Sequence, residues 1–234
     1  MISTLRREYL AAMGLQSWVV RKPAAASLEI LAPAAAASIQ TAGAAHREAT
    51  FDWTQLSERV AACTRCGLSA TRTQTVFGAG DLQAQWLIVG EAPGGDEDRV
   101  GEPFVGRAGQ LLNAMLCAIG LAREEVYVAN TLKCRPPNNR DPKPSETAEC
   151  FPFLERQIEL LKPKIMLVVG CIAAHTLLRT DEPLSRLRQR VHLFGASRVP
   201  LIVTYHPAYL LRTPSDKRKA WDDLKFAREA LARG

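Results

Sequence analysis

Four short runs of apolar and β-branched residues limit the folds open to this chain. They cover residues 86–90, 126–130, 165–170 and 201–204. Each run is followed by a loop and usually by a helix-like segment, namely residues 109–120, 146–161 and 171–178. Strands that alternate with helices favour a parallel sheet covered on both faces. We therefore predict an α/β fold of three αβα layers with a central, mainly parallel four-stranded sheet.

Unusual polar chemistry follows three of the four predicted strands. A loop rich in glycine, proline and acids follows Gly90, the second predicted strand ends at Asn130, and His206 follows the last strand. Ligands of open parallel sheets bind beyond the carboxyl ends of the strands. The three loops are therefore expected to meet in one site.

Four cysteines have the spacing of metal ligands. Cys63 and Cys66 form a C-x-x-C pair, and Cys134 and Cys150 supply a second, wider pair. A C-x-x-C turn directs both sulfurs to one side, where they can bind one metal centre. Thiolates suit zinc and an iron–sulfur cluster equally, so both assignments stay open on spacing. Unligated thiols and a redox-active C-x-x-C pair are the alternatives.

Charge and hydropathy argue against a membrane-spanning or secreted protein. The net charge of +6 permits a polyanionic partner without establishing one. No apolar run approaches the ~20 residues of a membrane span, and no secretory signal is recognisable. We therefore expect a cytoplasmic protein with reduced or metal-bound cysteines and no membrane partner. Cys117 and Cys171 lie in apolar helix-like runs and are predicted to pack as small buried hydrophobes.

Three long motifs support a resemblance to a known family. They are GEAPG and GEPFVG in the loop from Gly90, NTLKCRPP from Asn130, and HPAYLLR from His206. With the four cysteines, the chain from Phe51 to its C-terminus resembles family 4 uracil-DNA glycosylase. The resemblance implies hydrolysis of the bond between uracil and deoxyribose in DNA, the first step of base excision repair, which leaves an abasic site. It also implies a structural [4Fe–4S] cluster on the four cysteines.

The first two motifs contain residues suited to binding an extruded base. Phe104 offers an aromatic surface on which any base would stack. An amide at Asn130 can accept from uracil N3–H and donate to O4, whereas cytosine presents the opposite pair. The backbone around Gly90, Ala92 and Pro93 can approach the base closely. The structural alternatives are a core anchor at Phe104 and a strand-capping turn at Asn130.

His206 and the loop acids are the candidates for catalysis. A neutral His206 would donate a proton to the O2 oxygen of the departing uracil, and a simple turn residue is the alternative. Glu91 ranks first, and Glu97 second, as the carboxylate that stabilises the sugar cation or orients water. Related families carry an aspartate where Ala92 stands, and this departure favours a largely dissociative mechanism. No histidine-bearing insertion follows Pro137, so we expect ordinary turnover. The other acids are predicted to be solvated or to hold the loop, namely Asp96, Asp98 and Glu102.

DNA would be held by separate and unspecific contacts. The predicted phosphate contacts are the cations of the second motif and its loop, Lys133, Arg135, Arg140 and Lys143. The third motif suggests a wedge that fills the space left by the extruded base, with Leu210 or Leu211 as the wedge and Arg212 on the DNA backbone.

The N-terminal region is predicted to lie outside the catalytic domain of residues 51–234. Residues 1–22 suggest a short helix or docking peptide, and residues 23–50 form an alanine- and proline-rich linker. Residues 1–22 faintly resemble the N-terminus of the psi subunit of bacterial DNA polymerase III, which implies contact with the clamp loader of the replisome. A helix packed on the protein's own domain is the alternative.

Two other function classes remain open on the residues alone. One is a cysteine-metal module that binds nucleic acid without catalysis. The other is a nucleotide hydrolase, although the glycine-rich loop lacks the lysine and serine or threonine of a P-loop. We expect a monomer that needs neither Mg²⁺ nor a nucleotide cofactor.

Overall fold

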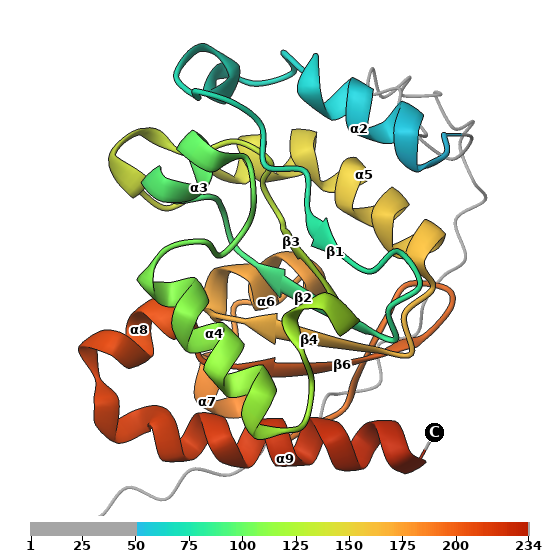
Figure 1. The fold of residues 1–234 in the computed structure, drawn as a ribbon, viewed down its shortest axis with the longest axis vertical. Coiled ribbons are helices and arrows are strands. Elements are labelled where there is room, and N and C mark those ends of the chain that lie inside the picture. Colours follow the sequence, from blue (N-terminus) through green and yellow to red (C-terminus); the bar gives the residue numbers. More distant parts are fainter. Residues whose placement is uncertain (1–50, 234) are drawn as a thin grey trace, which may run out of the picture. The chain divides into compact units, whose positions relative to one another are not determined.

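The computed structural model of this protein describes residues 51–233 (Figure 1). The predictions for residues 1–22 and 23–50 concern a part of the chain outside these residues. None of the described helices is long and apolar enough to cross a lipid bilayer.

A six-stranded mixed sheet forms the centre of the described domain, in the order β1-β3-β2-β4-β6-β5. Its four inner strands are parallel, and they are β3 (Val126–Asn130), β2 (Trp86–Gly90), β4 (Ile165–Val169) and β6 (Val199–Thr204). The predicted parallel four-stranded sheet is thus confirmed. Antiparallel strands β1 (Ala79–Gly80) and β5 (His192–Phe194) extend its two edges. These edge strands have too few residues to leave a pattern in the sequence.

The inner strands are apolar throughout because helices cover both of their faces. Every residue of β2, β3 and β4 is buried, as expected for parallel strands between two helical layers. One face packs on α5 (Pro144–Leu161), α6 (Cys171–Leu178) and α7 (Leu184–Leu187). The other packs on α4 (Arg107–Ala118), α8 (Pro207–Arg212) and α9 (Lys217–Arg233). Figure 1 shows α4 in front of the sheet, α6 behind it, and α9 running below β6 in this view.

A third, smaller core joins the first described helix to α5. Leu56 and Val60 of α2 (Trp53–Ala61) pack with Leu132 and Phe153. Asp52 begins α2 with a capping box, because its carboxylate accepts from the Gln55 N–H at 2.8 Å. This core surrounds the four candidate metal-ligating cysteines. The short helices that complete the domain are η1 (Gly67–Ala70), α3 (Gly95–Val100), η2 (Arg123–Glu125), η3 (Pro137–Asn139) and η4 (Pro214–Asp216).

Candidate active site

Three loops at the carboxyl edge of the sheet enclose one cavity of about 410 Å³. Phe104 comes from the loop after β2, Asn130 is the last residue of β3, and His206 follows β6. All three side chains line this cavity, together with Glu91 and Glu97. The parallel sheet explains the convergence, because neighbouring parallel strands end at the same edge.

Phe104 is held in an uncommon backbone conformation. Its φ of 58° lies in the left-handed region, which costs a bulky residue about 1–3 kcal/mol and occurs mainly at functional sites. Its ring centroid lies 5.7 Å from that of His206, at an angle of 31°. The Arg123 guanidinium supports the loop by donating to the Pro103 carbonyl oxygen at 2.9 Å.

Two glycines make room for this arrangement. A Cβ on Gly109 would lie 1.6 Å from the Phe104 carbonyl oxygen, so α4 can pack against the loop only without a side chain there. A Cβ on Gly90 would lie 2.4 Å from Asn130 Oδ1 and 2.7 Å from Phe104 Cζ. The packing around Phe104 therefore requires glycine at both positions.

Asn130 presents a buried acceptor to the cavity. The residue is 2 % exposed, and its Oδ1 atom has no hydrogen-bond partner among the described residues. A buried polar atom without a partner costs about 1–3 kcal/mol. A ligand that supplies a donor to Oδ1 would therefore recover this free energy on binding.

His206 is held as a neutral hydrogen-bond donor. Its Nδ1 atom accepts from the Ala208 backbone N–H at 3.1 Å, so the ring proton of the neutral form lies on Nε2. Burial, and next the charge of Arg212, lower the pKa of His206 to about 4. At neutral pH the imidazole is uncharged and has one N–H left to donate.

The carboxyl group of Glu91 has a raised pKa. Burial first, and then the charge of Asp141, raise the pKa of Glu91 to about 7. A carboxylate with a pKa near the working pH can exchange protons or change charge during a reaction.

The other acids of the loop mainly hold its shape. Glu97 Oε2 accepts from the Gly94 N–H at 3.0 Å and so caps α3, although its side chain also lines the cavity. The buried Asp98 accepts from the Thr73 N–H at 2.9 Å. Asp96 forms an exposed ion pair with Arg99.

Two predicted DNA contacts are wrong. Lys133 is 1 % exposed, and its ammonium group donates to the Asn130 carbonyl oxygen and to Gln157 Oε1 inside the protein. It therefore cannot reach a phosphate. Leu210 is 1 % exposed because it lies on the face of α8 that packs into the core, so it cannot act as a wedge. Leu211 is half-buried and Arg212 is exposed at the cavity rim.

The remaining predicted cations differ in their surroundings. Arg140 forms a bidentate pair with Glu146, at 2.9 and 2.6 Å, and this pair fixes the loop before α5. The half-buried Arg135 donates from Nε to Asn139 Oδ1 at 2.7 Å. Lys143 is exposed. The sequence had not singled out Asp141, Asn139 and Tyr209 as site residues, and all three line the cavity.

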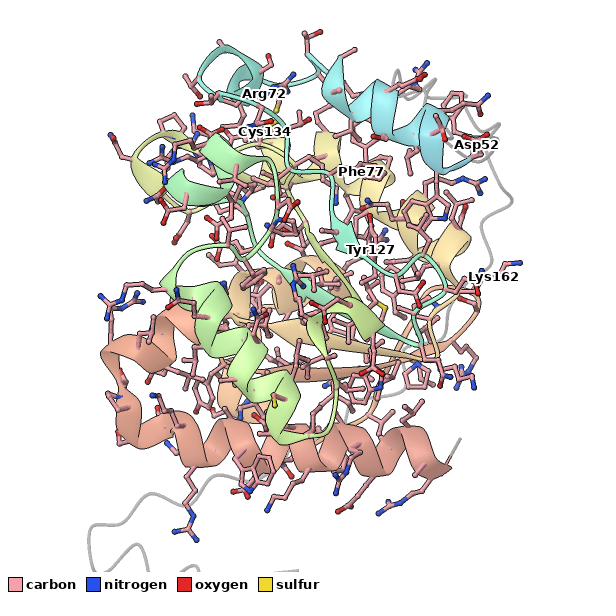
Figure 2. The ribbon with its side chains drawn as sticks, in the orientation of Figure 1. Asp52, Arg72, Phe77, Tyr127, Cys134 and Lys162 are labelled. Carbon is pink, nitrogen blue, oxygen red and sulfur yellow. The ribbon has the colours of Figure 1, made fainter. Side chains whose placement is uncertain are left out.

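Four cysteines line a second, small cavity beneath α2. They are Cys63, Cys66, Cys134 and Cys150. Cys134 Sγ accepts from Arg72 Nη1 at 3.0 Å, and Cys150 Sγ accepts from the Lys133 N–H at 3.2 Å. Figure 2 shows Arg72 beside Cys134. No group of three or more potential ligands within residues 51–233 is arranged to hold a single metal ion.

The other two cysteines do not belong to this site. The prediction that Cys117 is buried is wrong, because α4 presents it to solvent. Cys171 is half-buried, and its Sγ lies 3.1 Å from His175 Nε2.

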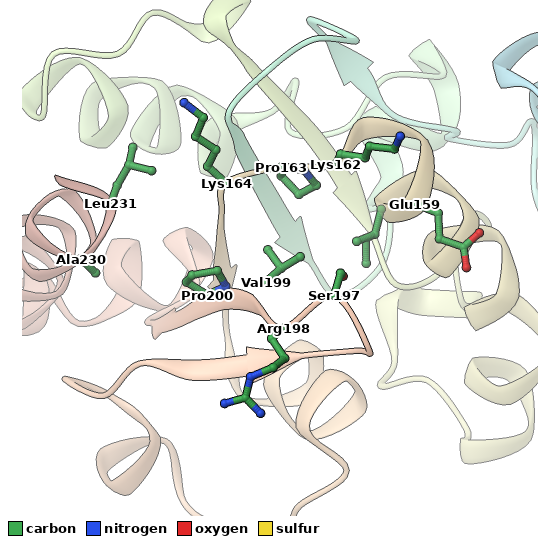
Figure 3. Close-up of a pocket in the computed structure, with 11 residues that line it drawn as sticks. Glu159, Lys162, Pro163, Lys164, Ser197, Arg198, Val199, Pro200, Ala230 and Leu231 are labelled. Carbon is green, nitrogen blue, oxygen red and sulfur yellow. The ribbon is translucent and has the colours of Figure 1, made fainter. Parts of the chain in front are cut away.

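A larger cavity of about 580 Å³ lies at the opposite edge of the sheet (Figure 3). Its walls include Val199 and Pro200 at the start of β6, Pro163 before β4, and Leu231 of α9. Neither of the two buried side chains with an unpartnered polar atom in residues 51–233 lines it. The cavity at the carboxyl edge is therefore the candidate active site.

Comparison with known proteins identifies the family of the chain. A family model described as the uracil DNA glycosylase superfamily matches residues 77–225. The chain is 42 % identical over 172 residues to the type-4 uracil-DNA glycosylase of Archaeoglobus fulgidus, covering 71 % of this chain and 86 % of that one. It is 41 % identical over 180 residues to the type-4 enzyme of Thermotoga maritima, covering 75 % and 93 % of the two chains. The type-4 enzyme of Pyrobaculum aerophilum is 40 % identical over 180 residues, covering 74 % and 92 %.

Proposed function

The chain belongs to the uracil-DNA glycosylase superfamily, and we propose that it hydrolyses the bond between uracil and deoxyribose in DNA. The product is an abasic site for base excision repair. The proposal depends on one observation, the convergence of Phe104, Asn130 and His206 on a single cavity. An aromatic surface, an open acceptor and a fixed donor are what recognition of a pyrimidine requires.

An extruded uracil would be recognised by its edge. Stacking on Phe104 would contribute about 1–3 kcal/mol for any base, so it supplies affinity without identity. Asn130 Oδ1, buried and unpartnered, would accept from uracil N3–H, and its amide nitrogen would donate to O4. Cytosine has no proton on N3 and carries an amino group at C4, so both contacts would be lost. Such mismatched polar groups give strong rejection.

His206 would stabilise the departing base. Cleavage of the glycosidic bond leaves negative charge on uracil, chiefly on O2 and O4. The Nε2 proton of a neutral His206 would donate to O2, and the donor gains strength as the charge develops. No charged imidazole is required, which agrees with a pKa lowered to about 4.

Glu91 would support the sugar as it gains positive charge. Its pKa of about 7 leaves about half of the molecules ionised at neutral pH. The ionised carboxylate would stabilise the oxocarbenium-like sugar or orient the attacking water. Glu97, which also lines the cavity, is the second candidate, although its bond to Gly94 gives it a structural task.

DNA would be gripped around the cavity rim. We assign phosphate contacts to the exposed Arg212 and Lys143 and to Arg135, and the wedge to Leu211. Each phosphate contact would steepen the dependence of affinity on salt by about one counterion. Arg140 would act mainly by holding its loop, since Glu146 already engages its guanidinium group.

The four-cysteine cavity supports a metal centre held by thiolates. All four thiols line this cavity, and two of their sulfurs accept N–H hydrogen bonds, as cluster ligands do. We infer a [4Fe–4S] cluster on Cys63, Cys66, Cys134 and Cys150, in line with the family resemblance of the sequence. When bound, it would cross-link the turn after α2, the loop after β3 and helix α5, with no part in the hydrolysis.

Release of uracil from a single-stranded oligonucleotide tests the activity. The protein should release uracil in the presence of EDTA, whereas a module that only binds nucleic acid would release none. Asn130→Asp should abolish release, because a carboxylate cannot donate to O4 and would repel it. Asn113→Asp, on the exposed face of α4, is the matched control and should keep full activity. Uracil release that is unchanged in Asn130→Asp would contradict the assignment.

Iron and sulfide analysis tests the metal centre. The purified protein should be brown and contain both elements, and Cys134→Ala should lose them with a lower Tm. A colourless protein that contains zinc would overturn the cluster assignment.

The N-terminal segment is proposed to serve a separate task. Residues 1–22, outside the described part of the chain, would dock on the clamp loader of the replisome. A pull-down with the full chain should capture the clamp loader, and deletion of residues 1–30 should abolish the capture. Equal capture by both forms, or capture by neither, would dispose of the docking idea. Gel filtration would check the expected monomer.

A further inference from the structure

Lys133 is a buried cation between the two candidate sites. It lies three residues after Asn130 and directly before Cys134. Its Nζ atom donates to the Asn130 carbonyl oxygen at 3.0 Å and to Gln157 Oε1 at 2.6 Å. Its backbone N–H donates to Cys150 Sγ at 3.2 Å. One residue thus contacts the strand end that carries the base-reading amide, helix α5 and a cysteine of the metal site.

Gln157 is itself fixed by neighbours on the other side. Its Nε2 atom donates to the Phe77 carbonyl oxygen at 3.0 Å and to the Tyr127 hydroxyl at 3.2 Å. These two bonds orient the amide so that Oε1 faces Lys133. Gln157 is fully buried, so its position is set by α5 and by the sheet rather than by solvent.

A lysine at this place needs a reason beyond packing. A buried ammonium group is costly unless its protons are hydrogen-bonded, and an apolar side chain of the same length would fill the space without that cost. The Asn130 carbonyl oxygen stands at the end of β3, where the sheet has ended. Two backbone hydrogen bonds hold the next two residues. The Thr131 N–H donates to the Gly90 carbonyl oxygen at 2.9 Å, and the Leu132 N–H donates to the Glu91 carbonyl oxygen at 3.0 Å.

We propose that Lys133 is a positioning residue for base recognition, which fixes Asn130 relative to α5 and the four-cysteine site. The Asn130 Oδ1 atom has no partner among the described residues. Its position therefore depends on the backbone, which β2 holds by pairing with Gly90 and which Lys133 holds at the Asn130 carbonyl oxygen. The metal site would then serve recognition indirectly, by holding the segment that carries Lys133. This inference rests on the proposed function, because it assigns Asn130 to the uracil edge.

Lys133→Met in the metal-loaded protein tests the proposal, because methionine has similar length and no hydrogen-bond donor. Lys164→Met, an exposed lysine directly before β4, is the matched control. Hydrogen exchange should become faster in residues 130–134 of the Lys133 variant and stay unchanged in residues 201–206. The dissociation constant for free uracil should rise at least tenfold, while that for DNA with an abasic site should stay within twofold. The iron and sulfide content should be unchanged in both variants.

A purely structural role would give a different pattern. Equal weakening of uracil and abasic-site DNA binding, or exchange that quickens across the whole domain, would overturn the proposal. So would unchanged uracil binding. If Lys133→Met does not fold, Gln157→Met replaces it. That variant removes one acceptor of Lys133, and it should show the same selective loss of uracil affinity in smaller measure.

The same measurements distinguish a failure of the glycosylase assignment from a failure of the role proposed for Lys133. A wild-type protein that neither releases nor binds uracil would refute the glycosylase assignment and this recognition role with it. The exchange measurement would still decide whether Lys133 fixes the backbone at Asn130.

Discussion

Replacing Glu91 with glutamine tests whether the folded protein raises the pKa of this carboxyl group. Burial, and then the charge of Asp141, raise the pKa of Glu91 from 4.5 to about 7. Between these values the folded protein keeps a proton on Glu91 that the unfolded chain has released. The folded state then binds more protons than the unfolded state, so the free energy of unfolding falls as the pH rises through this window.

The magnitude follows from the two pKa values. At roughly 1.36 kcal/mol per pKa unit, a rise from 4.5 to about 7 corresponds to about 3.4 kcal/mol. Partial exposure of the carboxylate to solvent reduces this to about 2 kcal/mol. Glutamine does not ionise, so the Glu91→Gln variant does not lose this free energy of unfolding as the pH rises. Relative to wild type, its Tm should rise by about 4–8 °C between pH 5 and pH 8.

Two measurements check the reasoning. Thermal unfolding is followed from pH 5 to pH 8 for wild type and Glu91→Gln, with the exposed Glu102→Gln as control. Uracil release is followed over the same range. The kcat of the wild type should rise through about pH 7 as Glu91 ionises, and the kcat of Glu91→Gln should not show this rise. Asp141→Asn should move this rise in kcat to lower pH, because it removes the negative charge that raises the pKa of Glu91. Parallel pH dependence of Tm in wild type and Glu91→Gln would refute the argument.

Three further changes have definite expected outcomes. His206→Ala should lower kcat by about 10²–10³, as loss of one oxyanion donor does. Single-turnover assays measure the chemical step, and an unchanged rate there would contradict the role of His206. Gly90→Ala should abolish uracil release, because its Cβ would overlap Asn130 and Phe104, whereas Gly67→Ala meets nothing within 4 Å and should be active. Arg188→Met should lower the free energy of unfolding by about 3 kcal/mol, because it leaves the fully buried Asp223 without its cation, and urea titration measures the loss.

The sequence was sufficient for the four inner strands of the sheet and for the convergence of the three loops at the candidate site. The bounds of β2 and β3 were predicted to the residue, because a strand covered on both faces must be apolar throughout. Parallel strands then bring the residues after their carboxyl ends together without further information. The two edge strands were missed, because two and three residues are too few to show an alternating or apolar pattern.

The sequence failed where a residue's environment is set by distant segments. Lys133 sits among cations in a proline-rich loop, which favours a solvent-exposed site. In the structure it is buried, and Gln157 Oε1 of α5 accepts a hydrogen bond from its ammonium group. Leu210 and Leu211 are adjacent leucines on a single short helix, and only the packing of α8 decides which one is buried. Cys117 lies in an apolar run, but α4 turns it to solvent.

The five acids of the first loop illustrate how structure assigns roles that composition leaves open. Glu97 caps a helix, Asp98 accepts from the backbone of a neighbouring segment, and Asp96 forms a surface ion pair. Glu102 is exposed. Within residues 51–233, only Glu91 among the five combines a place on the cavity wall with a pKa raised to about 7. A loop built for phosphate would be destabilised by so many carboxylates, whereas a loop that faces a sugar cation gains from one of them. The negative charge of the motif thus serves mostly to fold the loop, and Glu91 is the carboxylate that the proposed reaction would use to stabilise the sugar cation.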